Sequence, residues 1–143
     1  MNPYRLYALR LSARREVSPS FVRITLRGDD LATCSDILLD QRVKLLVGSP
    51  EGLAEVGASV EDWYPAWQDI ADERRPAMRT YTLVAVRPGS DGSGEVDIDV
   101  AIHPTDGAAP GMDFAATAPL GTPAALVAAE VGRDGYEDVG VAW

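Results

Sequence analysis

The residues best suited to chemistry lie in the stretch MRTYTLVAVR, residues 78–87. Here Arg79 is followed two positions later by Tyr81 and then directly by Thr82. A guanidinium donates paired, charge-assisted hydrogen bonds that suit a diphosphate. A tyrosine ring can stack on a flat heterocycle, and a threonine hydroxyl can bond a ring nitrogen. Together these groups can hold a flavin nucleotide, although the same residues also fit an ordinary strand with an exposed arginine.

The chemistry requires that this stretch be a strand, because the strand sets which side chains share a face. Pro76 precedes it and favours an extended chain. Successive side chains of a strand point to opposite faces. Arg79 and Tyr81 should therefore share one face, with Thr80 and Thr82 on the other, near the start of the strand.

The rest of the chain also reads mainly as short strands between glycine- and proline-rich turns. Apolar alternation predicts them at residues 5–16, 21–27, 42–47, 78–87 and 95–103, with closing strands at 123–130 and 136–143. Residues 31–40 are expected to be an irregular connection, and the glycine-rich residues 48–59 a surface loop. A helix is expected from Asp62, with Trp63 and Trp67 packing against the strands. The pattern favours one all-β domain over residues 1–143, a six-stranded antiparallel Greek-key barrel with one or two short helices.

Several stretches have a more specific likeness. From Asp62, the sequence DWYPAWQDIADERRPAMRTYT has a tyrosine- and tryptophan-containing helix that leads into a Pro-x-Met-Arg-x-Tyr-Thr strand. With residues 18–32, 40–47 and 97–103, it resembles the siderophore-interacting proteins, a family of flavin-dependent ferric-siderophore reductases. The matching segments come in the family's order over roughly the first 103 residues. The resemblance implies a flavin-reductase barrel and FAD as the cofactor.

The resemblance also implies roles for individual residues. Arg79 would hold the diphosphate, Tyr81 would cover the flavin ring, and Thr82 would bond a ring nitrogen, with Thr80 in the same cofactor-binding strand. His103 ends the family's Asp-x-Asp-x-x-x-His strand and is expected near the adenine or the diphosphate. Lys44 would meet an anionic siderophore if its strand lines the ring.

In the family, the histidine strand leads to a Gly-Pro-Ala-Ser-x-Trp-Ala motif, whose backbone amides at a helix start hold the diphosphate. The best match here is APGMDFAATAPLG, which makes Ala109, Gly111 and Met112 candidate phosphate-binding positions. Met112 replaces the family's serine, Phe114 replaces its tryptophan, and Asp113 adds a negative charge. We expect these differences to weaken FAD binding.

Charge and composition exclude other classes of protein. The net charge is −9 and the pI is about 4.5, which opposes nucleic-acid binding. Residues 1–87 carry 12 basic and 12 acidic side chains, so the acidic excess lies in residues 88–143. One cysteine, Cys34, and one histidine, His103, provide no metal cluster. No apolar run is long enough for a membrane helix or a signal peptide, so we expect a cytoplasmic protein.

Two functions from different classes remain open. The first, implied by the resemblance, is an FAD-binding domain that passes electrons from reduced flavin to a ferric siderophore and so releases iron. The family's nicotinamide-binding domain is expected to be absent, because no strand leads into a glycine-rich turn and helix; a separate electron-donor protein would then be needed. The second is a redox-inactive barrel that acts as a ligand-binding or interaction domain, favoured by the altered phosphate motif and the acidic C-terminal part. The chain is either a fragment or a natural single-domain member.

Overall fold

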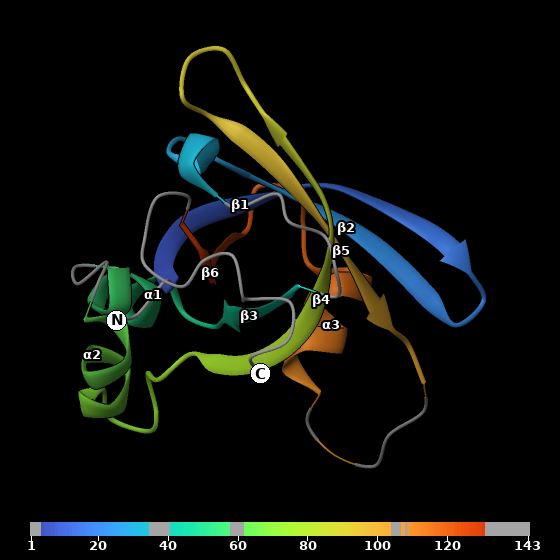
Figure 1. Ribbon diagram of the computed structural model, residues 1–143. Helices are drawn as coiled ribbons and strands as arrows, with labels where there is room; N and C mark the ends of the chain where they lie inside the picture. Colours follow the sequence, from blue (N-terminus) through green and yellow to red (C-terminus); the bar gives the residue numbers. More distant parts are fainter. Residues whose placement is uncertain (1–3, 35–40, 58–61, 104–106, 108, 131–143) are drawn as a thin grey trace.

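Six antiparallel strands close into a barrel in the order β1-β2-β5-β4-β3-β6 (Figure 1). The computed structural model describes residues 4–34, 41–57, 62–103, 107 and 109–130. The strands are β1 (Tyr4–Ser18), β2 (Phe21–Gly28), β3 (Arg42–Val47), β4 (Ala77–Pro88), β5 (Gly94–Ala101) and β6 (Pro123–Ala129). The predicted six-stranded antiparallel barrel is confirmed. The closing strand expected at 136–143 and most of the connection at 31–40 lie outside the described residues.

Three short α-helices and one 3₁₀ turn accompany the barrel: η1 (Leu31–Thr33), α1 (Pro50–Gly57), α2 (Trp63–Asp69) and α3 (Pro110–Thr117). The surface loop predicted at 48–59 was wrong for its described part, because α1 forms there. The Ser49 hydroxyl accepts a hydrogen bond from the Gly52 amide (3.1 Å), and this bond caps the first turn of α1. Leu53 and Val56 are buried at helical spacing. Gly52 allows close packing, since a Cβ there would collide with the Arg74 carbonyl oxygen.

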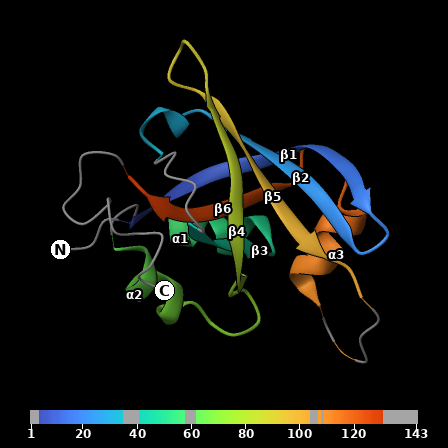
Figure 2. The same cartoon turned by 45° about the vertical axis from the view of Figure 1, so that its right-hand side comes forward.

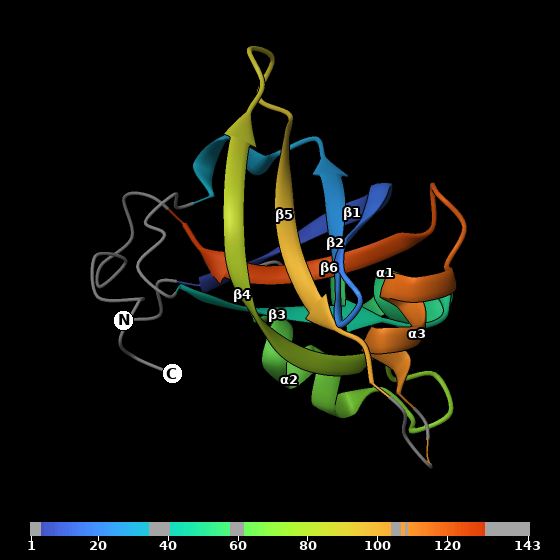
Figure 3. The ribbon, with the colours of Figure 1, turned by 90° about the vertical axis from the view of Figure 1, so that its right-hand side faces the viewer.

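The helices pack at two separate places. Helices α1 and α2 contact each other, and with the outer side of β3 and β6 they bury Leu46, Trp63, Ile70 and Val127. Helix α3 lies elsewhere, where it contacts β2, β3, β4 and β5 (Figures 1 and 3). Its Phe114 contributes to the barrel core. The tryptophan Trp63 packs against the barrel as predicted.

Strands β4 and β5 are paired over only half of β4. Residues 83–88 of β4 pair with β5, and a register shift falls between Leu83 and Ala85. A bulge of this kind bends the strand. Residues 77–82 pair with β3 alone. In Figure 3 the two strands lie side by side near their connecting turn, and the first part of β4 curves away from β5.

A buried polar network holds the paired half of β4. Arg87 donates to both carboxylate oxygens of Asp97 (2.8 and 2.7 Å), and the Thr25 hydroxyl donates to the same carboxylate (2.7 Å). Asp97 is 8% exposed, and these hydrogen bonds tie it to both neighbouring strands, β4 and β2. Within the described residues, no helix has the length and apolar character needed to cross a membrane.

Candidate functional site

A pocket of about 550 Å³ lies where β4 and β5 separate. Its lining includes four of the residues singled out in the sequence, three on β4 and one just beyond the end of β5. The lining residues are Phe21, Thr80, Tyr81, Thr82, Val84, Asp99, Ala101 and His103. The fold thus brings the Arg-x-Tyr-Thr strand and the histidine strand to one cavity.

Tyr81 lies between the barrel core and α3. It pairs across the sheet with Val43, whose side chain is fully buried, so Tyr81 shares the inward face of β4. The first turn of α3 approaches it so closely that a Cβ on Gly111 would collide with the phenol oxygen. Burial raises the pKa of the Tyr81 phenol, and the charge of Arg79 opposes this only in part. The phenol therefore stays protonated near neutral pH.

Arg79 meets the same helical turn. A Cβ on Gly111 would lie 3.3 Å from its Cγ, so the stem of Arg79 runs alongside the start of α3. Its guanidinium is exposed and donates to the carbonyl of Met78 (2.9 Å). No carboxylate among the described residues forms an ion pair with it.

The start of α3 adds backbone donors beside this guanidinium. The helix begins after Ala109, which forms no side-chain cap, and Pro110 lacks an amide hydrogen. The amides of Gly111 and Met112 belong to the first turn, whose N–H groups have no acceptor within a helix. A cation and two backbone amides form a donor set that suits an anion, a phosphate group above all.

Thr80 and Lys44 lie on the outward face of neighbouring strands. They are cross-strand partners, and the Lys44 ammonium donates to the Thr80 hydroxyl (3.2 Å). Thr82 shares this face of β4, since it lies two positions on. Lys44 does not line the pocket itself, and its charge reaches the pocket wall through Thr80.

Met112 contacts His103, which lines the pocket. The backbone amide of His103 donates to the Met112 sulfur (3.2 Å). The Met112 side chain is therefore directed toward the end of β5, and only its backbone amide belongs to the donor set at the helix start. Asp113 is exposed in the same turn.

One residue that supports the site could not be recognised from the sequence alone. Arg14 of β1 donates to the carbonyl oxygens of Phe114 (3.2 Å), Ala115 and Ala118 (2.7 Å) at the C-terminal end of α3. More than 95 residues separate Arg14 from these acceptors. Nothing in the residues around Arg14 indicates that contact.

Comparison with known proteins decides the family. A model of the siderophore-interacting FAD-binding domain matches residues 10–132. The chain belongs to this family. FAD is accordingly the cofactor of the siderophore-interacting FAD-binding domain described here. No curated protein sequence matches the chain.

Solved structures agree with the fold of a siderophore-interacting FAD-binding domain. The siderophore-interacting protein SipS from Aeromonas hydrophila is 27% identical, with a TM-score of 0.55 over 90% of this chain and 44% of its own. A siderophore utilization protein from T. fusca is 24% identical, with a TM-score of 0.58 over 89% and 45%. The FAD/NAD-binding domain of a nitric oxide dioxygenase from Vibrio cholerae shares the fold at 14% identity, with a TM-score of 0.52 over 89% and 44%. The chain thus spans less than half the length of these proteins.

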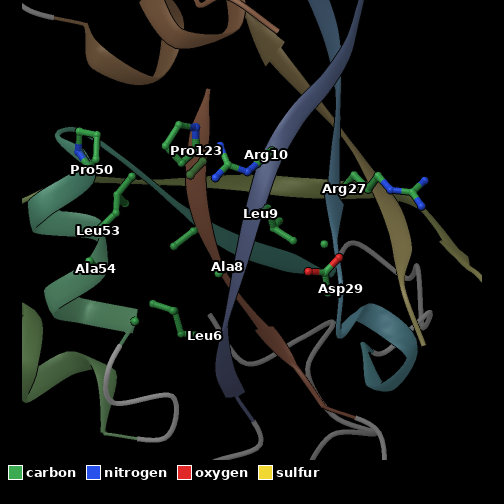
Figure 4. A pocket seen from close by; sticks show the side chains of 14 residues that line it. Leu6, Ala8, Leu9, Arg10, Arg27, Asp29, Pro50, Leu53, Ala54 and Pro123 are labelled. Atoms are coloured by element: carbon green, nitrogen blue, oxygen red, sulfur yellow. The ribbon is translucent and has the colours of Figure 1, made fainter. Parts of the chain in front are cut away.

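A larger groove of about 800 Å³ lies outside the barrel, between α1 and strands β1 and β6 (Figure 4). Pro50 and Leu53 form one wall, and Pro123 and Arg10 lie across from them. None of the candidate cofactor residues lines this groove. Its walls are mainly aliphatic, and Arg10 already donates to the carbonyl of Gly121 (2.9 Å). The smaller pocket, and not this groove, therefore contains residues that the sequence singles out for a flavin nucleotide.

The described part of the chain holds no group of three or more His, Cys, Asp or Glu side chains placed to bind a metal ion. The single described cysteine, Cys34, is buried.

Proposed function

We propose that this FAD-binding domain passes electrons from reduced flavin to a ferric siderophore, so that the weakly held Fe(II) is released. The observation that carries the proposal is that Arg79, Tyr81 and the first turn of α3 meet beside the pocket between β4 and β5, which Tyr81 itself lines. The family description and two of the solved relatives name siderophores, which supports the choice of substrate.

The residues at the pocket fit an FAD molecule. Arg79 and the amides of Gly111 and Met112 would bind the diphosphate, with Ala109 starting the helix that presents them. The bare Cα of Gly111 supports this assignment, because any side chain there would push the amides away from Arg79 and Tyr81. The altered phosphate motif keeps these backbone donors, since Met112 replaces only a side-chain hydroxyl.

The flavin ring would lie against β4. The Tyr81 ring would cover one side of it, and the Thr82 hydroxyl would bond a ring nitrogen, with Thr80 beside it. His103 lines the same pocket and would contact the adenine or the diphosphate. Tyr81, half-buried and neutral, would limit water access without adding charge.

Bound FAD supplies the redox chemistry, because it stores two electrons and can release them one at a time. Each ferric ion takes one electron, so one reduced cofactor serves two ferric siderophores. Lys44 would attract an anionic ferric siderophore toward the ring through its position beside Thr80. A separate electron-donor protein would reduce the flavin again.

Anaerobic stopped-flow mixing tests this function. The FAD-loaded protein is reduced chemically and mixed with ferric hydroxamate, catecholate and carboxylate siderophores, while a ferrous chelator reports Fe(II). We expect saturable flavin oxidation, faster than with free reduced FAD, and two Fe(II) per flavin. A Lys44→Gln variant should need a higher siderophore concentration to reach half-saturation, and its FAD affinity should be unchanged.

The opposite result would favour the redox-inactive barrel. If flavin oxidation neither saturates nor exceeds the rate of free reduced FAD with any of the three siderophore types, the domain binds FAD without serving ferric siderophores. An unchanged saturation curve for Lys44→Gln would remove Lys44 from the substrate site.

A further inference from the structure

One arginine of the N-terminal strand β1 binds the C-terminal end of α3. Arg14 donates to three carbonyl oxygens there, those of Phe114, Ala115 and Ala118. The last carbonyls of a helix lack partners within the helix, and a cation beside them also complements the helix dipole. Arg14 therefore fixes α3 to β1, beside the β1–β2 hairpin (Figure 2).

An irregularity in β1 aims Arg14 at the helix. The register of β1 against β2 shifts between Leu11 and Ala13, so one extra residue, Ser12, is accommodated there. After the shift Arg14 pairs with Ile24, a fully buried core residue. Arg14 therefore shares the inward face, where α3 covers the end of the barrel. Without the shift, alternation from Leu11 would turn Arg14 outward.

The other end of α3 is the end proposed to bind the diphosphate. Its first turn meets Tyr81 and Arg79 through Gly111, and Ala109 provides no side-chain cap. A helix of eight residues is not stable by itself, so its position depends on such outside contacts. The two ends are linked by little more than two turns of rigid backbone.

We propose that Arg14 is a positioning residue for the FAD diphosphate. By holding the last carbonyls of α3, it sets where the amides of Gly111 and Met112 stand relative to Arg79. The inference rests on the placement of FAD at α3 and not on electron transfer to a siderophore. Losing the Arg14 contacts loosens the helix, and ordering it again on binding lowers the affinity for phosphate-bearing ligands.

The chain contains a matched control for this effect. Arg75 donates to three carbonyl oxygens at the end of α2, those of Trp67 (3.1 Å), Gln68 (2.8 Å) and Ile70 (2.8 Å). It performs the same chemistry as Arg14, but on α2, which packs with α1 against the outer side of β3 and β6. A variant at Arg75 reports what the loss of such a cap does to the fold alone.

The experiment compares Arg14→Met and Arg75→Met by their affinities for FAD, FMN and riboflavin, measured by flavin fluorescence. Both variants keep an apolar stem and lose the carbonyl contacts. For Arg14→Met we expect FAD affinity to fall about tenfold more than riboflavin affinity, as for one lost charge-assisted hydrogen bond, with FMN between them. For Arg75→Met the FAD-to-riboflavin ratio should stay at its wild-type value. Urea unfolding of each variant shows how much of the protein is folded.

Equal losses for FAD and riboflavin, or no loss for either, would overturn the proposal. If Arg14→Met does not fold, the FAD-to-riboflavin affinity ratio is measured for Arg14→Lys instead. Lysine keeps the charge but cannot bond all three carbonyls at once. Wild-type protein that binds riboflavin as tightly as FAD would overturn the placement of the diphosphate at α3, and the role of Arg14 with it. Failure of siderophore reduction leaves all of these ratios unchanged, so the two proposals fail separately.

Discussion

The two halves of β4 each carry an arginine, and the two arginines do different work. On residues 83–88, which pair with β5, Arg87 is bound by Asp97 and also lies 3.7 Å from a carboxylate oxygen of Glu95. On residues 77–82, which pair with β3 alone, Arg79 has no carboxylate partner among the described residues and lies beside α3 instead. One strand thus changes from a structural element to a candidate binding element at its bulge.

The difference lies in what faces each half. Strand β5 brings two acids to Arg87, and Thr25 of β2 helps to hold Asp97 in place. Helix α3 brings backbone amides to Arg79, and these add positive partial charge instead of neutralising the guanidinium. An arginine on a strand is thus available for an anionic ligand where the sheet opens and no acid faces it. The following predictions test this contrast.

The largest expected effect is on cofactor affinity in Arg79→Ala. Losing a charge-assisted contact to the diphosphate costs about 1.5–3 kcal/mol, roughly ten- to a hundredfold in FAD affinity. The melting temperature should not change, because Arg79 is exposed and forms no ion pair in the described structure. Fluorescence titration with FAD measures the affinity, and Arg87→Ala is the control, with lower stability and unchanged affinity. Equal FAD affinity in wild type and Arg79→Ala would remove Arg79 from the site.

A slightly smaller effect is expected where the helix touches β4. In Gly111→Ala the new Cβ meets the Tyr81 phenol, and such overpacking costs about 1–3 kcal/mol of folding stability. FAD affinity should fall as well, because the first turn of α3 moves. Tyr81→Phe in the same chain removes the colliding oxygen and should restore part of the stability.

Gly94 of β5, which pairs with Pro88, provides the matched control for the paired half of β4. A Cβ there would lie 2.9 Å from the carbonyl oxygen of Arg87, so Gly94→Ala should also lower the melting temperature. Its FAD affinity should stay at the wild-type value, measured by the same titration. If Gly94→Ala weakens FAD as much as Gly111→Ala does, the two halves of β4 are not functionally separate.

The smallest expected effect is on the acid stability of the paired half. Hydrogen bonds from Arg87 hold the pKa of Asp97 below its ordinary value of 3.8, against the opposing effect of burial. A carboxyl with a lowered folded pKa stabilises the protein fully above its unfolded pKa. That contribution is lost as the pH falls below 3.8 and through the lowered folded pKa.

In Asp97→Asn this acid-dependent loss should be absent. The free energy of unfolding should be about 1–2 kcal/mol lower at pH 7, a range that allows for the partial exposure of Arg87, and flatter toward low pH. Urea titrations across the pH range measure both. Asp72→Asn is the control, because Asp72 is 88% exposed in its ion pair with Arg75 and should change little. If the free energy of unfolding of Asp97→Asn falls as steeply toward low pH as that of the wild type, other carboxylates cause the fall.

Local patterns in the sequence determined the strands. The strand predicted at 21–27 forms as β2, and its alternation buries Ile24 and Leu26, because burial on one face of a strand repeats every second residue. The Arg-x-Tyr-Thr strand was found for the same reason. Helix α1 was not predicted, although Ser49 and Pro50 form a helix start, because the glycines within and around it are typical of a loop.

The tertiary structure alone decided how these elements meet. The bulges near Ser12 and Val84 shift the register by one residue, and such a shift turns side chains to the opposite face without any local signal. The contacts of Arg14 with α3 and of Gly111 with Tyr81 join residues that are far apart along the chain. The sequence by itself therefore determined which residues are candidates for binding a flavin nucleotide. The closure of the barrel decided which arginine is neutralised by acids and which one lies beside a helix start, because that depends on which strand or helix is the neighbour in space.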